Sequence, residues 1–325
     1  QRSFTHTHRD TPIVYTISSR DSTETRRVLS SLRFCAKLKN ILKRENGCGN
    51  VRSEEEMMEL IIRTAQEDER IRAALLVGSR ANPTVPRDKY QDYDITYLVK
   101  DVSPFYDNPD WIQAHFGRPA IMQAPEKMTL LPPEGDGHYT YLMIFEDCCR
   151  IDLSFEDKPY VNDGEPAIPL LDKDGILPPL PPPSDHCWHI QPPTQKLFSD
   201  CCNEFWWCLN NAGKGVARDE LPYVMQMFNV CVRDMLDQML DWYIGTDQGF
   251  AVSSGKAKKY FKKYLPSNLY KLYVKTYSDG EYSHIWTAVF TACDLFHTAA
   301  LHVAEKMGYR YNEEEEQAMR RYLIM

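Results

Sequence analysis

Apolar residues in the first half of the chain follow helical spacing in some segments and strand spacing in others. Ser53 and Glu56 form a capping-box pattern, which predicts the start of a helix, and apolar residues recur every three or four positions behind it. The apolar run 73–77 predicts a buried strand that stops at Gly78. Further strands are expected at 92–99, 141–145 and 150–155. This alternation of helices and strands indicates a sheet domain over residues 51–157.

The second half of the chain changes character twice. Residues 158–193 are rich in proline, which favours an extended connector and excludes helix over the run 178–183, and one last strand is expected at 168–171. Residues 194–325 have helical periodicity. Glycine is expected to stop each of three long helices, with Gly213 ending 194–211, Gly245 ending 222–244 and Gly308 ending 281–307. The sequence therefore predicts an α+β protein, with a mixed β-sheet and flanking helices followed by an α-helical bundle domain.

Residues 1–50 form a basic leader that ends in a Gly-rich junction. Ten Lys/Arg against four Asp/Glu give it a charge of about +6, and apolar residues recur at helical spacing between the basic ones. A membrane-surface or partner helix is one interpretation. An appended or non-native segment is the interpretation we favour, and deletion of these residues would then leave activity intact.

The remaining chain is strongly acidic. Because the whole protein has a net charge of −8, residues 51–325 carry about −14. This charge argues against a nucleic-acid partner and favours a cationic one. No run approaches the roughly 18 apolar residues of a membrane span, and the polar start has no secretory signal, so we expect a cytoplasmic protein without a membrane partner. A monomer is our expectation, but the sequence does not determine the oligomeric state.

Three carboxylates and a Gly-Ser turn are the candidates for chemistry. Asp92 and Asp94 stand two residues apart on an expected strand and so point to the same face. Asp152 lies between two apolar residues on another strand, so its side chain can lie beside those of Asp92 and Asp94. Adjacent carboxylates repel each other, and a divalent cation such as Mg2+, bound together with phosphate oxygens, removes that conflict. Gly78 and Ser79 end the preceding strand, where a glycine turn with free N–H groups can cradle phosphates.

These segments resemble a known family. Gly78-Ser79-Arg80 and Gln91-Asp92-Tyr93-Asp94-Ile95 are similar to the signature of the DNA-polymerase-β-like nucleotidyltransferases. The chain from about residue 52 to its end resembles, more narrowly, the aminoglycoside 6-adenylyltransferases that inactivate streptomycin. Further matching segments lie at 67–72, 131–137, 150–153, 200–207 and 277–279. Residues 1–50 lie outside the resemblance.

The resemblance implies a role for each member of the candidate site. Asp92 and Asp94 would hold two Mg2+ ions that bridge the phosphates of ATP, the co-substrate. Asp152 would serve as a third metal ligand or as the general base for the acceptor hydroxyl, and the sequence leaves both open. A second group would contact the nucleotide, with the triphosphate cradled by Gly78 and Ser79 and assisted by Arg80 and Lys256.

A cationic aminoglycoside requires carboxylates and aromatic walls. The candidates are Glu134 and Asp136 on a Gly-rich loop and Glu204, Trp206 and Trp207 on the first helix of the bundle. We expect Asn203 and both tryptophans to share one helix face and line a cleft. Core packing of the tryptophans and a solvated turn for Glu134 and Asp136 are the alternatives.

The function implied is transfer of AMP from ATP to a hydroxyl of streptomycin, with release of pyrophosphate. The 6-position comes from the resemblance alone. Two competing functions remain, one being a transferase of the same fold that acts on another aminoglycoside, an RNA end or a protein hydroxyl. The other is a protein that binds nucleotide or antibiotic without turnover.

Overall fold

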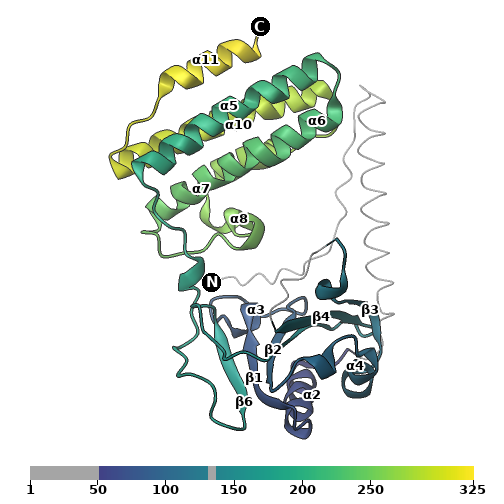
Figure 1. Ribbon diagram of the computed structural model, residues 1–325. Helices are drawn as coiled ribbons and strands as arrows, with labels where there is room; N and C mark the ends of the chain where they lie inside the picture. Colours follow the sequence, from purple (N-terminus) through teal and green to yellow (C-terminus); the bar gives the residue numbers. More distant parts are fainter. Residues whose placement is uncertain (1–50, 131–136) are drawn as a thin grey trace, which may run out of the picture.

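The structure is a computed structural model, and it describes residues 51–130 and 137–325. A six-stranded sheet forms one half of the molecule and a group of helices forms the other (Figure 1). The basic leader and two substrate candidates, Glu134 and Asp136, lie outside the described residues.

The sheet has the strand order β3-β4-β5-β2-β1-β6. Its strands are β1 (Ile71–Val77), β2 (Tyr93–Val99), β3 (Pro119–Gln123), β4 (His138–Phe145), β5 (Arg150–Glu156) and β6 (Ala167–Asp172). The central β2 and β5 run parallel, whereas the other neighbours pair antiparallel, so the sheet is mixed as predicted. The expected strand inside the Pro-rich connector is confirmed as β6, which extends the sheet beside β1.

Helices α2 (Glu54–Glu67) and α4 (Pro109–Phe116) lie against the sheet (Figure 1). The predicted capping box is present, with the Ser53 hydroxyl accepting from the Glu56 N–H and the Glu56 carboxylate accepting from the Ser53 N–H. The apolar side of α2 packs on the strand positions that alternate with the carboxylates, and the Tyr97 hydroxyl donates to the carbonyl of Ile61 at 2.6 Å. One face of the sheet is thereby sealed in a core, and the acidic positions are left on the other.

The helical half has its own apolar core, built mainly from the three longest helical stretches. Its elements are α5 (Gln195–Ala217), α6 (Leu221–Gln226), a π-helical turn (Met227–Val232), α7 (Arg233–Asp247), α8 (Phe261–Tyr264), α9 (Ser267–Lys275), α10 (Tyr282–Met307) and α11 (Glu313–Leu323). The α10 helix ends as predicted at Gly308, whose φ of +70° is left-handed. Pro222 lies in the first turn of α6, also as predicted.

The expected stops at Gly213 and Gly245 are wrong, because both residues lie inside helices. A Cβ at Gly213 would lie 3.3 Å from Leu323, and one at Gly245 would lie 2.5 Å from the ring of Phe250. Both glycines therefore allow close packing of neighbouring elements. Tertiary contacts override the local preference of glycine for a helix end.

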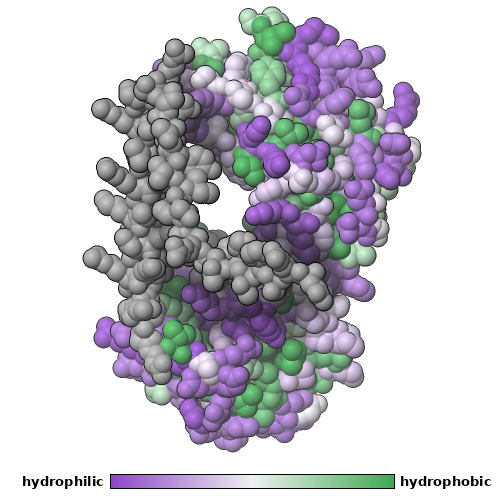
Figure 2. All heavy atoms as spheres, turned by 180° about the vertical axis from the view of Figure 1, so that it is seen from behind, coloured by the Kyte–Doolittle hydropathy of each residue, from purple (hydrophilic) through white to green (hydrophobic). Residues whose placement is uncertain are grey.

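The outer surface is predominantly hydrophilic on the face seen in Figure 2, with apolar residues in small separate groups. Among the described residues, no helix combines the length and the apolarity needed to cross a membrane.

Candidate active site

Two of the three predicted carboxylates are neighbours across adjacent strands. In the parallel β2–β5 pair, Asp94 stands directly opposite Asp152. The residues that flank them are in the core, as the alternation predicted, with Tyr93 4% and Ile151 0% exposed. Asp92 precedes the first residue of β2 and is one alternation step from Asp94. The sheet thus brings all three acids together on one face, at one end of its two central strands.

The Gly78 turn lies against Asp94. Gly78 has a φ of +68°, and a Cβ there would lie 3.0 Å from Cγ of Asp94 and closer still to its Oδ2. The backbone N–H of Ser79 donates to the Asp94 carboxylate. Glycine is therefore required both by the left-handed backbone and by the close approach of the carboxylate. The turn and the acids form one unit.

A residue that sequence reasoning did not select, Arg150, joins two of the acids. Its Nη1 lies 3.2 Å from Oδ2 of Asp92, and its Nη2 lies 2.7 Å from Oδ2 of Asp152. Nε adds a second hydrogen bond to Asp152 at 2.9 Å. Arg150 is the first residue of β5, two positions before Asp152, so both side chains point to the same face.

The crowding of negative charge alters the protonation of the acids. Burial, together with the charges of Asp152 and Asp92, raises the pKa of Asp94 to about 6, against the effect of Arg150 and of the Ser79 N–H. Burial and Asp152 also raise the pKa of Asp92, whereas Arg150, Arg80 and Lys256 act in the opposite direction. The influence of Lys256 places a cation from the helical half within electrostatic reach of the acids.

Arg80 holds the loop that carries the acids. Its guanidinium is buried, donates to the carbonyls of Gln91 (3.0 Å) and Asp92 (3.1 Å), and stacks 3.9 Å from the Tyr93 ring centroid. A third nitrogen pairs with Glu54 at 3.0 Å. The structure therefore directs Arg80 to the loop backbone, and we assign it as a positioning residue in place of the expected direct contact with phosphate.

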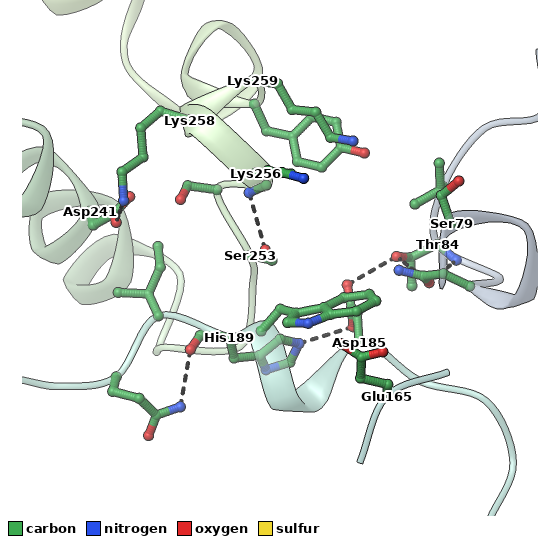
Figure 3. A pocket seen from close by; sticks show the side chains of 18 of the residues that line it. Ser79, Thr84, Glu165, Asp185, His189, Asp241, Ser253, Lys256, Lys258 and Lys259 are labelled. Atoms are coloured by element: carbon green, nitrogen blue, oxygen red, sulfur yellow. Dashed lines mark hydrogen bonds and ion pairs between the residues drawn. The ribbon is translucent and has the colours of Figure 1, made fainter. Parts of the chain in front are cut away.

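A pocket of about 790 Å3 lies beside the turn, between the sheet and the helices. Ser79 and Lys256 are on opposite walls, and Asp241 of α7 lies at the end remote from Ser79 (Figure 3). The segment 185–190 crosses the pocket, and its Asp185 accepts from Thr84 at 2.9 Å and contacts His189 at 3.0 Å. The pocket thus joins the predicted phosphate turn to a basic residue of the other half.

Comparison with known proteins identifies the family. The model of the family described as "Streptomycin adenylyltransferase" matches residues 51–325. The chain belongs to the streptomycin adenylyltransferase family. An aminoglycoside 6-adenylyltransferase of Bacillus subtilis (strain 168) is 39% identical over 82% of this chain and 95% of the relative. That of Campylobacter jejuni is 37% identical over 80% of this chain and 91% of the relative.

A solved structure also matches this member of the streptomycin adenylyltransferase family. The crystal structure of an aminoglycoside 6-adenyltransferase from Bacillus subtilis has 34% sequence identity and a TM-score of 0.42, and the match covers 84% of this chain and 97% of that one. Membership of the family makes the protein an adenylyl-transferring enzyme and implies a nucleotide co-substrate.

The expected substrate contacts on α5 are not brought to the pocket. Trp206 is 2% exposed, and its indole N–H donates to the Tyr311 hydroxyl at 3.0 Å, so it belongs to the bundle core. Trp207 is 65% exposed. The prediction that the two tryptophans share one face is wrong, because successive helical residues differ by about 100°. Glu204 is exposed and accepts a hydrogen bond from the Cys208 thiol, also away from the pocket lining.

Several pocket residues carried no signal that sequence reasoning used. Glu165, Asp185 and Trp188 come from the Pro-rich connector, and Asp241 lies on the long helix α7. Asp241 is 6% exposed and pairs with Lys258, while its Oδ1 has no hydrogen-bond partner. These acids come from segments without a motif, so tertiary structure alone brings them to the pocket.

The carboxylates are suitable ligands for a divalent cation, but their side chains are not arranged in the geometry of a metal site. Asp94 is pushed toward protonation, a conflict that a cation would relieve. Gly78 allows the turn to approach that carboxylate closely, because a Cβ there would collide with Oδ2 of Asp94. Within residues 51–130 and 137–325, however, no group of three or more His, Cys, Asp or Glu stands in ligand geometry as it is. Arg150 occupies the space between Asp92 and Asp152 that a shared ion would need.

Proposed function

We propose that the protein transfers AMP from ATP to the 6-hydroxyl of streptomycin and releases pyrophosphate in a Mg2+-dependent reaction. The observation that carries this proposal is the position of Asp94 opposite Asp152, with the Gly78 turn against Asp94. Membership of the streptomycin adenylyltransferase family and the names of the relatives supply the direction of the chemistry.

The nucleotide would enter the pocket beside the turn. The backbone at Gly78, the hydroxyl of Ser79 and the ammonium of Lys256 would hold the β- and γ-phosphates. Asp92 and Asp94 would hold Mg2+. The bound metal would neutralise the triphosphate and the charge that develops on the leaving pyrophosphate.

In the transfer step, the acceptor oxygen attacks the α-phosphorus, and the bond from that phosphorus to the oxygen bridging to the β-phosphate breaks. The hydroxyl proton passes to a base, and the electron pair of the broken bond leaves with pyrophosphate. Asp152 is the proposed base because it stands beside Asp94 on the adjacent strand. Alternatively, Asp152 would serve as a third metal ligand. The two roles predict different dependences of the transfer rate on pH.

A cationic antibiotic suits the acidic surroundings of this site. Glu165 and Asp185 line the pocket, and Trp188 offers an aromatic wall. Guanidinium groups, such as those of streptomycin, pair well with carboxylates and stack on indole rings. The acidic balance of residues 51–325 would also attract a cation over longer distance.

The test is mass spectrometry of the acceptor after incubation with enzyme, ATP and Mg2+. Streptomycin should gain the mass of one adenylyl group, while a 2-deoxystreptamine aminoglycoside, tRNA and a carrier protein should gain none. Adenylylation of tRNA or of protein, with streptomycin unmodified, would refute the proposed acceptor.

A further inference from the structure

The guanidinium of Arg150 is shared by two of the three carboxylates. Its Nε and Nη2 donate bidentate hydrogen bonds to the Asp152 carboxylate at 2.9 and 2.7 Å. Its Nη1 lies 3.2 Å from Oδ2 of Asp92. Planar bidentate pairing of this kind is the strongest form of carboxylate recognition by arginine. The side chain of Arg150 is nevertheless 42% exposed, so it can leave without disturbing the core.

The oxygens that Arg150 contacts are the ones a metal ion would need. A cation that bridges Asp92 and Asp152 requires their lone pairs, and a guanidinium that points its N–H groups at the same atoms competes for them. This competition agrees with the lack of ready ligand geometry among the described acids. The guanidinium of Arg150 therefore lies where a cation shared by Asp92 and Asp152 would lie.

We propose that Arg150 is an internal counter-ion of the site, which holds Asp92 and Asp152 together before the metal arrives and must release Asp92 for the metal to bind. The inference rests on the metal site of the proposed function and adds a residue that competes with the ion. Arg150 would thus lower the affinity of the free enzyme for Mg2+. It would act as a positioning residue because its effect is exerted through the two carboxylates that it contacts.

The direction of the expected change in metal affinity follows from charge. Arg150→Gln removes one positive charge at hydrogen-bond distance from two carboxylates and leaves their oxygens free. Two unit charges at such distances interact appreciably even when they are partly solvated. We expect the variant to bind a divalent cation about tenfold or more tightly than the wild type. Arg150→Lys keeps the charge but loses the planar fork, so its affinity should stay within about threefold of the wild type.

The experiment is a Mn2+ titration of the nucleotide-free protein, followed by the electron paramagnetic resonance signal of free Mn2+. Arg72→Gln is the matched control. Arg72, at the end of β1 remote from Gly78, makes a similar bidentate contact with Asp174, which follows β6. The Arg72→Gln variant should bind Mn2+ like the wild type. Thermal unfolding of each variant checks that it is folded.

Tighter Mn2+ binding by Arg150→Gln, with Arg72→Gln and Arg150→Lys near the wild type, supports the proposal. Equal or weaker binding by Arg150→Gln overturns it, and so does the absence of Mn2+ binding in every protein. If Arg150→Gln fails to fold, weaker binding by Arg150→Lys than by the wild type overturns the proposal instead. Adenylylation of streptomycin by the wild type, measured in parallel, shows whether the proposed function stands when the counter-ion role fails.

Discussion

Asp94 and Asp152 face each other across the parallel strands β2 and β5, in direct register. The sheet fixes this proximity, because the neighbours of both residues are packed in the core. Two carboxylates held at this spacing destabilise the protein when both are ionised. The arrangement is explained by a ligand that removes the repulsion, and a divalent cation bound with nucleotide is such a ligand.

Asp94→Asn should stabilise the metal-free protein at neutral pH. The folded-state pKa of Asp94 is raised to about 6 from 3.8, so the folded protein binds a proton more tightly than the unfolded chain. Stability therefore falls as pH rises from about 4 to about 6, and the penalty persists above that window. The variant removes a penalty of up to about 3 kcal/mol at pH 7.5, and the difference disappears toward pH 4. Urea unfolding in EDTA at both pH values measures it.

Asp174→Asn is the control for that experiment. The hydrogen bond from Arg72 lowers the pKa of Asp174, so the same exchange should bring no stabilisation at pH 7.5. Added Mg2+ should raise the unfolding temperature of the wild type and leave that of Asp94→Asn nearly unchanged. A wild type that is more stable than Asp94→Asn in EDTA at pH 7.5 would contradict the account.

Gly78→Ala should inactivate the enzyme. The added Cβ meets the Asp94 carboxylate, and the φ of +68° strains any other residue. We expect kcat/KM to fall by about 100-fold or more, with a loss of about 1–3 kcal/mol in stability. Gly117→Ala is matched, since Gly117 has a φ of +90° but nothing within 4 Å of a Cβ. It should cost stability and retain activity, and equal activity of the two variants would refute the role of the turn.

Lys256→Gln should weaken ATP binding. Loss of a charge-assisted hydrogen bond of about 1.5–3 kcal/mol corresponds to a rise of roughly 10–100-fold in the KM for ATP. Lys262→Gln removes an exposed charge from the same lysine-rich segment and should leave that KM within about twofold. Steady-state kinetics with varied ATP distinguish the two, and equal effects would reduce Lys256 to part of a general basic surface.

Trp206→Ala and Trp207→Ala should differ sharply in stability. Trp206 is buried, stacks edge-on with Phe205 and Phe296 and donates to Tyr311, so its truncation should cost about 3–5 kcal/mol. Trp207 is largely exposed, and its replacement should change the free energy of unfolding by about 0.5 kcal/mol or less. Urea denaturation gives both values, and similar losses would contradict the assigned faces of α5.

The sheet and its acids could be predicted because strand alternation is local information. Asp94 and Asp152 each lie between two apolar residues, which predicts their face, and the parallel pairing brings these two together. Asp92 is predicted on the same face because it lies two residues before Asp94. The edge strand β3 gave no such signal, because four of its five residues are exposed and no alternation results. The prediction therefore worked where one side of a strand is buried.

Contacts between distant segments could not be predicted. The pairing of Arg150 with Asp92 joins β5 to the loop before β2, and the pocket acids come from the Pro-rich connector and from α7. The helix boundaries predicted at Gly213 and Gly245 were wrong because packing decides them. Gly213 lies against Leu323, and Gly245 lies against Phe250 and Ile190. Register and packing between elements decide such features.

Transfer of label from ATP radiolabelled at the α-phosphate to streptomycin is the most direct measurement. With Mg2+ the wild type should transfer the label, excess EDTA should abolish the transfer, and Asp94→Asn should slow it by about 100-fold or more. Transfer by the wild type that is unaffected by EDTA, or by Asp94→Asn at the wild-type rate, would contradict the claim that these carboxylates bind a metal for adenylyl transfer.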